Sequence, residues 1–219
     1  MLLTMRIASR TAAALLAAAT VLLPSCTRYV DDARAVAGPD RSVLAESEVS
    51  QCQAVDAPLT TIPAQRDEEP VLKVPQPPGW MRTTKLDSEL FRFTMVNRSL
   101  STDGFASSVV VTLESMRGIE EPDAVFDDVR GAMESGFGAT DLRVTEHTLC
   151  GLPAQMMHFQ TPVLGGIAPH PASALVAVLH TDGTTYAVSV VVQTADPDDP
   201  VYQRDTDTIL TGFQMLPPN

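Results

Sequence analysis

Residues 174–194 read ALVAVLHTDGTTYAVSVVVQT, two apolar runs on either side of Asp182-Gly183. An Asp-Gly pair favours a two-residue type I′ turn, because both central residues of that turn have positive φ. The stretch therefore predicts a β-hairpin in which Thr181 faces Thr184.

Both faces of this predicted hairpin are apolar. Its register pairs Leu179 with Tyr186, Ala177 with Val188 and Leu175 with Val190, and it leaves Val176, Val178, Ala187, Ser189 and Val191 on the opposite face. A sheet that is apolar on both faces must be covered on both, so we expect a helix on each side.

The neighbouring sequence supplies further strands and two helices. Alternating or apolar runs predict strands at residues 71–75, 90–96, 105–113, 142–148 and 154–161, the first of them as an edge strand. Pro122 begins an amphipathic helix in which Val125, Val129, Met133 and Phe137 recur every four residues, and a closing helix follows Asp199-Pro200. The predicted fold class is α+β, an α/β/α sandwich with a mostly antiparallel sheet of about seven strands.

The N-terminus has the pattern of an export signal. Arg6 and Arg10 precede residues 11–24, which carry no charge and are shorter than the roughly 20 residues of a membrane-spanning helix. Residues 23–26, Leu-Pro-Ser-Cys, resemble a bacterial lipobox, so we expect a lipoprotein signal peptide over 1–25 and lipidation at Cys26. The alternative is an ordinary secretory signal with Cys26 as a plain thiol, and either Met1 or Met5 is the start.

The charge balance argues against nucleic acid as a partner. The chain has 15 Lys+Arg against 27 Asp+Glu, a formal net charge of -12, which provides no basic surface for nucleic acid. Residues 26–70 are polar and contain several prolines, so we expect a flexible tether there and a folded domain over 71–219. The part of the tether around Cys52 is expected to be held against the domain. The predicted location is the extracytoplasmic face of the cell membrane, with the protein anchored by its lipid.

The cysteine count predicts one disulfide. With Cys26 taken by the lipid, Cys52 and Cys150 remain, and an even pair in an oxidising compartment is normally bridged. The alternative is two free thiols.

The common catalytic and metal-binding spacings do not occur. The sequence contains no Gly-x-Ser-x-Gly, no His-Glu-x-x-His, no phosphate-binding Gly-rich loop and no Cys-x-x-Cys. Its four histidines are 10–12 residues apart, wider than zinc spacing within one element. We therefore predict no catalytic residue, no metal and no cofactor, and we assign the acidic runs at Glu121 and Asp199 to helix N-termini.

One loop stands out as a candidate contact surface. Residues 162–169 are apolar and rich in Gly and Pro, a composition that is costly to leave in water unless it packs or meets a partner. We place the candidate ligand or partner surface at Leu164 and Ile167 of this loop, with Met156 and Trp80, although Trp80 follows a rigid Pro-Pro-Gly turn where packing is the commoner role.

The order of these features resembles a known lipoprotein family. It includes the entry Val74-Pro75 to Pro78-Gly79-Trp80, the strand 108–113 with Gly118-Ile119 and Pro122-Asp123-Ala124-Val125 after it, the turn Leu149 to Pro153 and the closing helix. In this order the chain resembles the LpqN-type lipoproteins of mycobacteria and actinobacteria, which are similar in fold to PsbP. The resemblance implies a non-enzymatic envelope lipoprotein linked to mycolate-type lipids, envelope transporters or mycolyltransferases.

The predicted function is therefore a membrane-anchored accessory or binding module for envelope lipids or envelope proteins. Two alternatives from other classes remain open at this stage. One is a cryptic envelope ester hydrolase, and the other is a purely structural surface antigen.

Overall fold

The computed structural model describes residues 51–218. The predicted signal peptide and Cys26 lie outside this range. The main sheet has the order β3-β4-β5-β9-β8-β7-β6, with every neighbouring pair antiparallel. Its strands are β3 (Met81–Thr83), β4 (Phe91–Thr102), β5 (Phe105–Arg117), β6 (Thr140–Leu149), β7 (Leu152–Gln160), β8 (Pro171–Thr181) and β9 (Thr184–Gln193).

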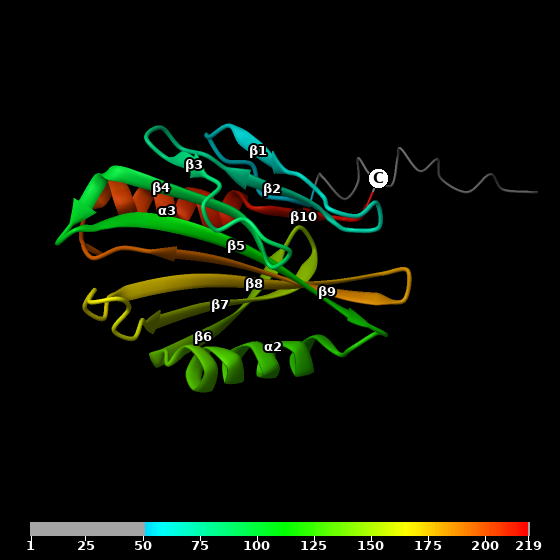
Figure 1. Ribbon diagram of the computed structural model, residues 1–219. Coiled ribbons are helices and arrows are strands. Elements are labelled where there is room, and N and C mark those ends of the chain that lie inside the picture. The colour runs from blue at the N-terminus through cyan, green and yellow to red at the C-terminus, as the bar shows by residue number, and fades with distance from the viewer. Residues whose placement is uncertain (1–50, 219) are drawn as a thin grey trace, which may run out of the picture. The chain divides into compact units, whose positions relative to one another are not determined.

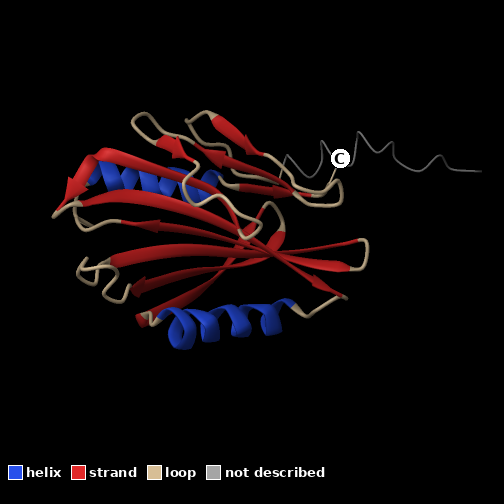
Figure 2. Ribbon diagram, viewed as in Figure 1, coloured by secondary structure: helices blue, strands red, loops and turns tan. Residues whose placement is uncertain are grey.

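The two α-helices of residues 51–218 cover opposite faces of this sheet, as Figures 1 and 2 show. Helix α2 (Pro122–Gly131) continues into a π-helical segment, η1 (Ala132–Phe137), and lies on one face. Helix α3 (Pro200–Gly212) lies on the other, where the Asp199 side chain accepts hydrogen bonds from the first backbone N–H groups, as expected for a helix N-cap. The predicted α/β/α sandwich with seven antiparallel strands is confirmed.

A second, smaller sheet of three strands was not anticipated. It consists of β1 (Leu59–Ile62), β2 (Val71–Pro75) and β10 (Gln214–Leu216), in the order β1-β2-β10. The strand at 71–75 is thus a central strand, and the prediction of an edge strand was wrong. Strands β1 and β10, its partners, were not predicted because their sequences are too short and too irregular to show a strand pattern.

The central hairpin has the predicted register. Thr181 pairs with Thr184, Leu179 with Tyr186, Ala177 with Val188 and Leu175 with Val190. Asp182 and Gly183 have φ values of 50° and 74°, as a type I′ turn requires.

The side chains of β8 and β9 enter two separate hydrophobic clusters. Leu175, Ala177, Leu179, Tyr186, Val188 and Val190 pack with α3 and the small sheet, and Ala172, Ala174, Val176, Val178 and Ala187 pack with α2. The sheet therefore separates an α3-side core from an α2-side core.

A β-bulge in β4 changes which face its first residues occupy. Phe91 pairs with Thr112 and Phe93 with Val111, so Arg92 is an extra residue between them. Phe91 consequently lies on the α2 side and Phe93 in the α3-side core, whereas regular alternation would put both on one face. The Arg92 side chain instead forms a buried ion pair with Glu69 at 2.7 Å.

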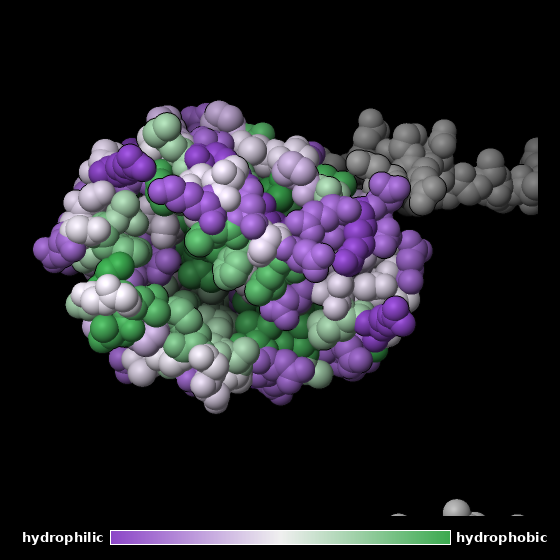
Figure 3. Space-filling model, viewed as in Figure 1, coloured by the Kyte–Doolittle hydropathy of each residue, from purple (hydrophilic) through white to green (hydrophobic). Residues whose placement is uncertain are grey.

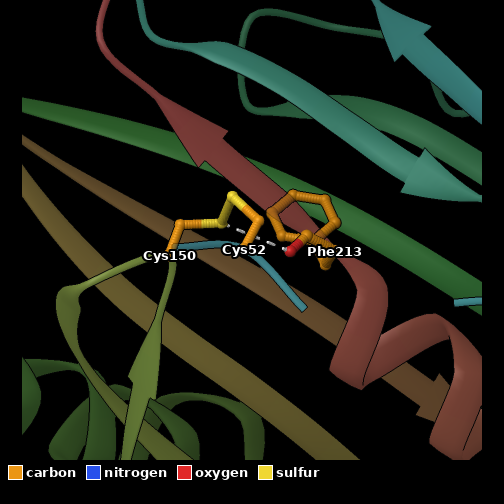
Figure 4. Close-up of a disulfide and its surroundings, with 3 residues drawn as sticks. All are labelled: Cys52, Cys150 and Phe213. Atoms are coloured by element: carbon orange, nitrogen blue, oxygen red, sulfur yellow. Dashed lines mark hydrogen bonds between the residues drawn. A yellow bond between two sulfur atoms is a disulfide. The ribbon is translucent and has the colours of Figure 1, made fainter. Parts of the chain in front are cut away.

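Residues before Val71 take part in the folded unit. Strand β1 pairs with β2, and Ile62 is buried in the α3-side core. A disulfide joins Cys52 to Cys150, the pairing expected from the cysteine count (Figure 4). The Cys150 sulfur also lies 3.9 Å from the Phe213 carbonyl oxygen, a packing contact, since a bridged sulfur carries no proton. Residues 52–70, which the sequence analysis placed in the tether, thus contribute a disulfide cysteine and strand β1 to the folded unit.

Candidate functional site

A large cavity lies between α2 with η1 and the facing side of the seven-stranded sheet. Its volume is 570 Å³, and its lining comes from β4, β5, β7, β8, β9, α2, η1 and the loop after β7. Most of the lining side chains are apolar, among them Val110, Val129, Met133, Phe159, Val176 and Val191. Figure 3 shows a hollow lined by hydrophobic residues on this side of the molecule.

Small side chains on the sheet create the space. Ala174, Ala187 and Ser189 all line the cavity, where the opposite face of the same two strands carries Leu175, Val188 and Val190. Helix α2 buries only Val125 and Phe126 fully, so it does not fill the volume that these small residues leave. The cavity is thus a consequence of residue size on one face of the sheet.

The mouth of the cavity is formed by side chains that line it and also face solvent. Phe91 is 37% exposed and Phe137 is 42% exposed, although both line the cavity. Phe137 also meets Phe159 edge to face, with ring centroids 6.4 Å apart. Neither phenylalanine was among the residues predicted for a site.

The apolar loop 162–169 reaches the same mouth. Leu164, predicted as a contact residue, lines the cavity, and Ile167 pairs with it through two backbone hydrogen bonds of 3.1 and 2.9 Å. Gly165 and Gly166 between them have φ values of 57° and 89°, which glycine adopts without strain. Ile167 is half-buried in the same turn.

His170 holds the base of this loop. It is 3% exposed, and its backbone carbonyl accepts from the Thr161 N–H at 2.9 Å. Its ring nitrogens lie within hydrogen-bond distance of Thr161 Oγ1 and Ala168 O on one side and Gln193 Oε1 on the other. The histidine is a structural clamp, a role that spacing along the sequence did not reveal.

Met156 and Trp80 lie away from this cavity. Met156 pairs with Leu175 and so faces α3, because its neighbours Met157 and Phe159 face α2. There it lines a separate cavity of 420 Å³ with residues of α3. Trp80 is 2% exposed and donates its indole N–H to Asp205 at 2.9 Å, so it belongs to the core and not to an accessible surface.

Polar groups near the large cavity are few, and those with charge are acidic. Glu114 and Asp128 are the ionisable side chains that line it, with Thr112, Thr161, Ser189 and Gln193 as neutral polar groups. No Lys or Arg among residues 51–218 contributes to the lining. This lining favours alkyl groups and repels an anion.

A third, polar cavity of 260 Å³ surrounds the ion pair of Glu69 and Arg92. Burial alone would raise the pKa of Glu69, but hydrogen bonds from Arg92 and from the Gln65 backbone, with the Arg92 charge, hold this pKa below its usual 4.5. The carboxylate is therefore ionised wherever the protein is folded near neutral pH.

The described residues show little that resembles catalytic or metal chemistry. No group of three or more potential metal ligands gathers within residues 51–218, and no helix in that range has the length and apolar character of a membrane span. His158 Nδ1 lies 2.9 Å from Ser173 Oγ, but these two residues are direct register partners on adjacent strands, where such contacts are common.

Comparisons with known proteins identify solved structures with a similar fold. No protein-family model and no curated protein matches the sequence. Among solved structures, LpqN of Mycobacterium tuberculosis, described as involved in cell envelope biogenesis, matches with 14% identity and a TM-score of 0.58, covering 74% of this chain and 93% of that one. The Ran-binding protein Mog1p of Saccharomyces cerevisiae matches with 13% identity and a TM-score of 0.44, covering 73% of this chain and 96% of that one. The resemblance expected from the sequence is thus confirmed for the fold, which this chain shares with LpqN.

Proposed function

We propose that this protein is a lipid-anchored, extracytoplasmic binding module that holds an alkyl chain of an envelope lipid in the cavity beneath α2. The observation that carries the proposal is the 570 Å³ apolar cavity. Its volume lies within the roughly 300–1,000 Å³ typical of small-molecule sites, and such sites combine apolar walls with a few polar groups.

Several further observations support an envelope role. The disulfide is typical of an oxidising, extracytoplasmic compartment. The lipobox at Cys26 would anchor the chain in the inner membrane, and LpqN, whose fold it shares, is involved in envelope biogenesis. A mycolate-type chain is the ligand that the family resemblance implies, and an envelope transporter or mycolyltransferase is the implied partner.

The first experiment asks whether the cavity takes an alkyl chain. A water-soluble monoglyceride is titrated against the protein while methionine methyl groups are followed by NMR. Met133 lines the large cavity and Met156 lines the cavity on the other face, so we expect shifts at Met133 and none at Met156. Shifts confined to Met156, or none at all, would contradict the proposal.

Filling the cavity provides the matched mutational test. The series Ala187→Val, Ala187→Leu and Ala187→Phe adds volume stepwise inside the cavity, and we expect monoglyceride affinity to fall at each step. Ser173→Phe adds comparable volume beside the cavity on the opposite face and serves as control. Equal losses in both would show that the cavity beneath α2 is not the binding site.

The non-enzymatic assignment is tested at the Ser173 and His158 pair. We expect no turnover of short- and long-chain esters by the wild-type protein. Turnover that Ser173→Ala abolishes would establish the hydrolase alternative, and an absence of both turnover and alkyl binding would favour a purely structural antigen.

The anchor is tested independently of the ligand. Labelled palmitate should be incorporated by the wild-type chain in the producing bacterium and not by Cys26→Ala. Equal labelling of both proteins would remove the lipoprotein assignment.

A further inference from the structure

We propose that the mouth of the cavity is a bilayer-insertion surface, through which the protein draws its ligand directly from the membrane that carries its own anchor. The surface, called the mouth rim below, consists of Phe91, Phe137 and the loop 162–169. The inference rests on the proposed function and adds to it the surface that meets the membrane.

The mouth rim gathers exposed apolar side chains from three distant segments. Val163 is 65% exposed and adjoins Leu164 in the loop, while Phe137 ends η1 and Phe91 begins β4. Phe91, Phe137 and Leu164 all line the same cavity, so the three segments border one space. Large exposed apolar groups around one opening mark a contact surface, where scattered ones carry no such meaning.

The loop has the construction of a preformed protrusion. It carries no charged residue over 162–169, and Figure 1 shows it extending past the ends of β7 and β8. The Leu164–Ile167 turn shapes its tip, and His170 with Thr161 fixes its base. Its backbone groups at the tip are paired with each other, which lowers the cost of leaving water.

The occupant that fits this surface is the acyl region of a lipid leaflet. The expected anchor at Cys26 lies 25 residues before residue 51, so the domain stays within about 90 Å of the bilayer even if that segment is fully extended. The carboxylates of Glu114 and Asp128 line the cavity and the chain has a net charge of -12, so attraction to anionic headgroups does not drive the contact. We therefore expect insertion of apolar side chains to drive the contact, because the membrane binding of interfacial segments increases with the apolar area that they bury.

Vesicle partitioning of the exported full chain tests the proposal, with Cys26→Ser removing the lipid attachment point. We expect binding to phosphatidylcholine vesicles that changes little between low and high salt, and no stronger binding to vesicles containing phosphatidylglycerol. The pair Val163→Ser and Ile167→Ser removes apolar groups of the loop without changing a cavity-lining side chain. Both side chains would be buried in the bilayer on insertion, so losing them should lower the partition coefficient roughly a hundredfold.

The control pair is Met81→Ser and Ile119→Ser, which are 67% and 60% exposed and line no part of the cavity. We expect this pair to partition within twofold of the parent chain. Equal losses in the two pairs, no loss in the loop pair, or self-association abolished by the loop pair would overturn the proposal, the last result indicating a second copy as the occupant.

Monoglyceride binding in solution separates this inference from the proposed function. If the loop pair binds the soluble monoglyceride normally but no longer partitions onto vesicles, both statements stand. If the parent chain binds monoglyceride but never vesicles, the insertion surface is wrong while the binding function survives. If it partitions onto vesicles but no monoglyceride enters the cavity, the proposed function fails.

Discussion

The two faces of the seven-stranded sheet are covered by one helix each, but they differ in how completely they are filled. On the α3 side, Trp80, Phe93 and Phe213 pack against large side chains of β8 and β9, and the small sheet adds a further layer. On the α2 side, alanines and a serine face a helix that buries only two residues fully, and an apolar cavity of 570 Å³ stays open. The 420 Å³ cavity on the α3 side is smaller, and its lining includes the exposed side chains of Gln203 and Asp207. The difference indicates that stability is concentrated on one face and binding on the other.

Removing the disulfide should have the largest effect on stability. The bridge closes a loop of 98 residues on the α3 side, and the chain-entropy model gives about 4 to 5 kcal/mol for such a loop as an upper value. Cys52→Ser with Cys150→Ser should lower the free energy of unfolding by up to that amount in urea titrations. Monoglyceride affinity of the folded protein should stay unchanged, and a parallel loss of affinity would show that the two faces are coupled.

Truncating one phenylalanine on each face compares the packing directly. Phe213→Ala, on the filled face, should cost about 3 to 5 kcal/mol, the usual range for a buried aromatic. Phe159→Ala removes a side chain that already borders empty space, so it should cost less than half as much. Equal costs by denaturant unfolding would mean that the two cores are equally well packed.

The ion pair of Glu69 and Arg92 makes a pH-dependent contribution to the free energy of unfolding. Glu69→Gln leaves the Arg92 charge buried without its partner and should cost about 3 kcal/mol at pH 7. Because folding lowers the Glu69 pKa, the extra stability of the wild type over Glu69→Gln is fully present above the pKa of Glu69 in the unfolded state. It is lost as the pH falls through the pKa of Glu69 in the folded state. Urea unfolding at pH 7 and at pH 2 to 3 should show the gap between wild type and variant closing in acid. A gap that persists at low pH would contradict this linkage.

The smallest effect is also the sharpest test of the comparison. Ala187→Val adds two methyl groups to the cavity and should raise stability by about 0.5 to 1 kcal/mol while weakening alkyl binding. Ala177→Val makes the same change in the filled core and should destabilise by about 1 to 3 kcal/mol through overpacking. Stability changes of the same sign in both variants would refute the difference between the faces.

The candidate site was only partly predictable from the sequence. Leu164 was predicted as a contact residue because an uncharged Gly/Pro-rich loop is costly to leave in water. This argument does not depend on where the loop lies in the fold. Met156 was assigned to the same surface, but strand alternation places it on the α3 side. It lies three residues before Phe159, so the two side chains point to opposite faces of the sheet. Phe137 shared the stripe of the predicted helix, yet only the cavity shows that it stands at an opening.

The sequence alone determined what depends on neighbouring residues. The Asp182-Gly183 turn sets the hairpin register and Asp199 caps α3. The count of three cysteines, with one of them at a predicted export signal, leaves one pair to bridge. Only the tertiary structure decided the rest. The bulge at Arg92 moves Phe91 onto the α2 side, and the packing of α2 over a row of small side chains leaves a cavity. Both depend on contacts between segments far apart in the chain, which no local pattern of residues records.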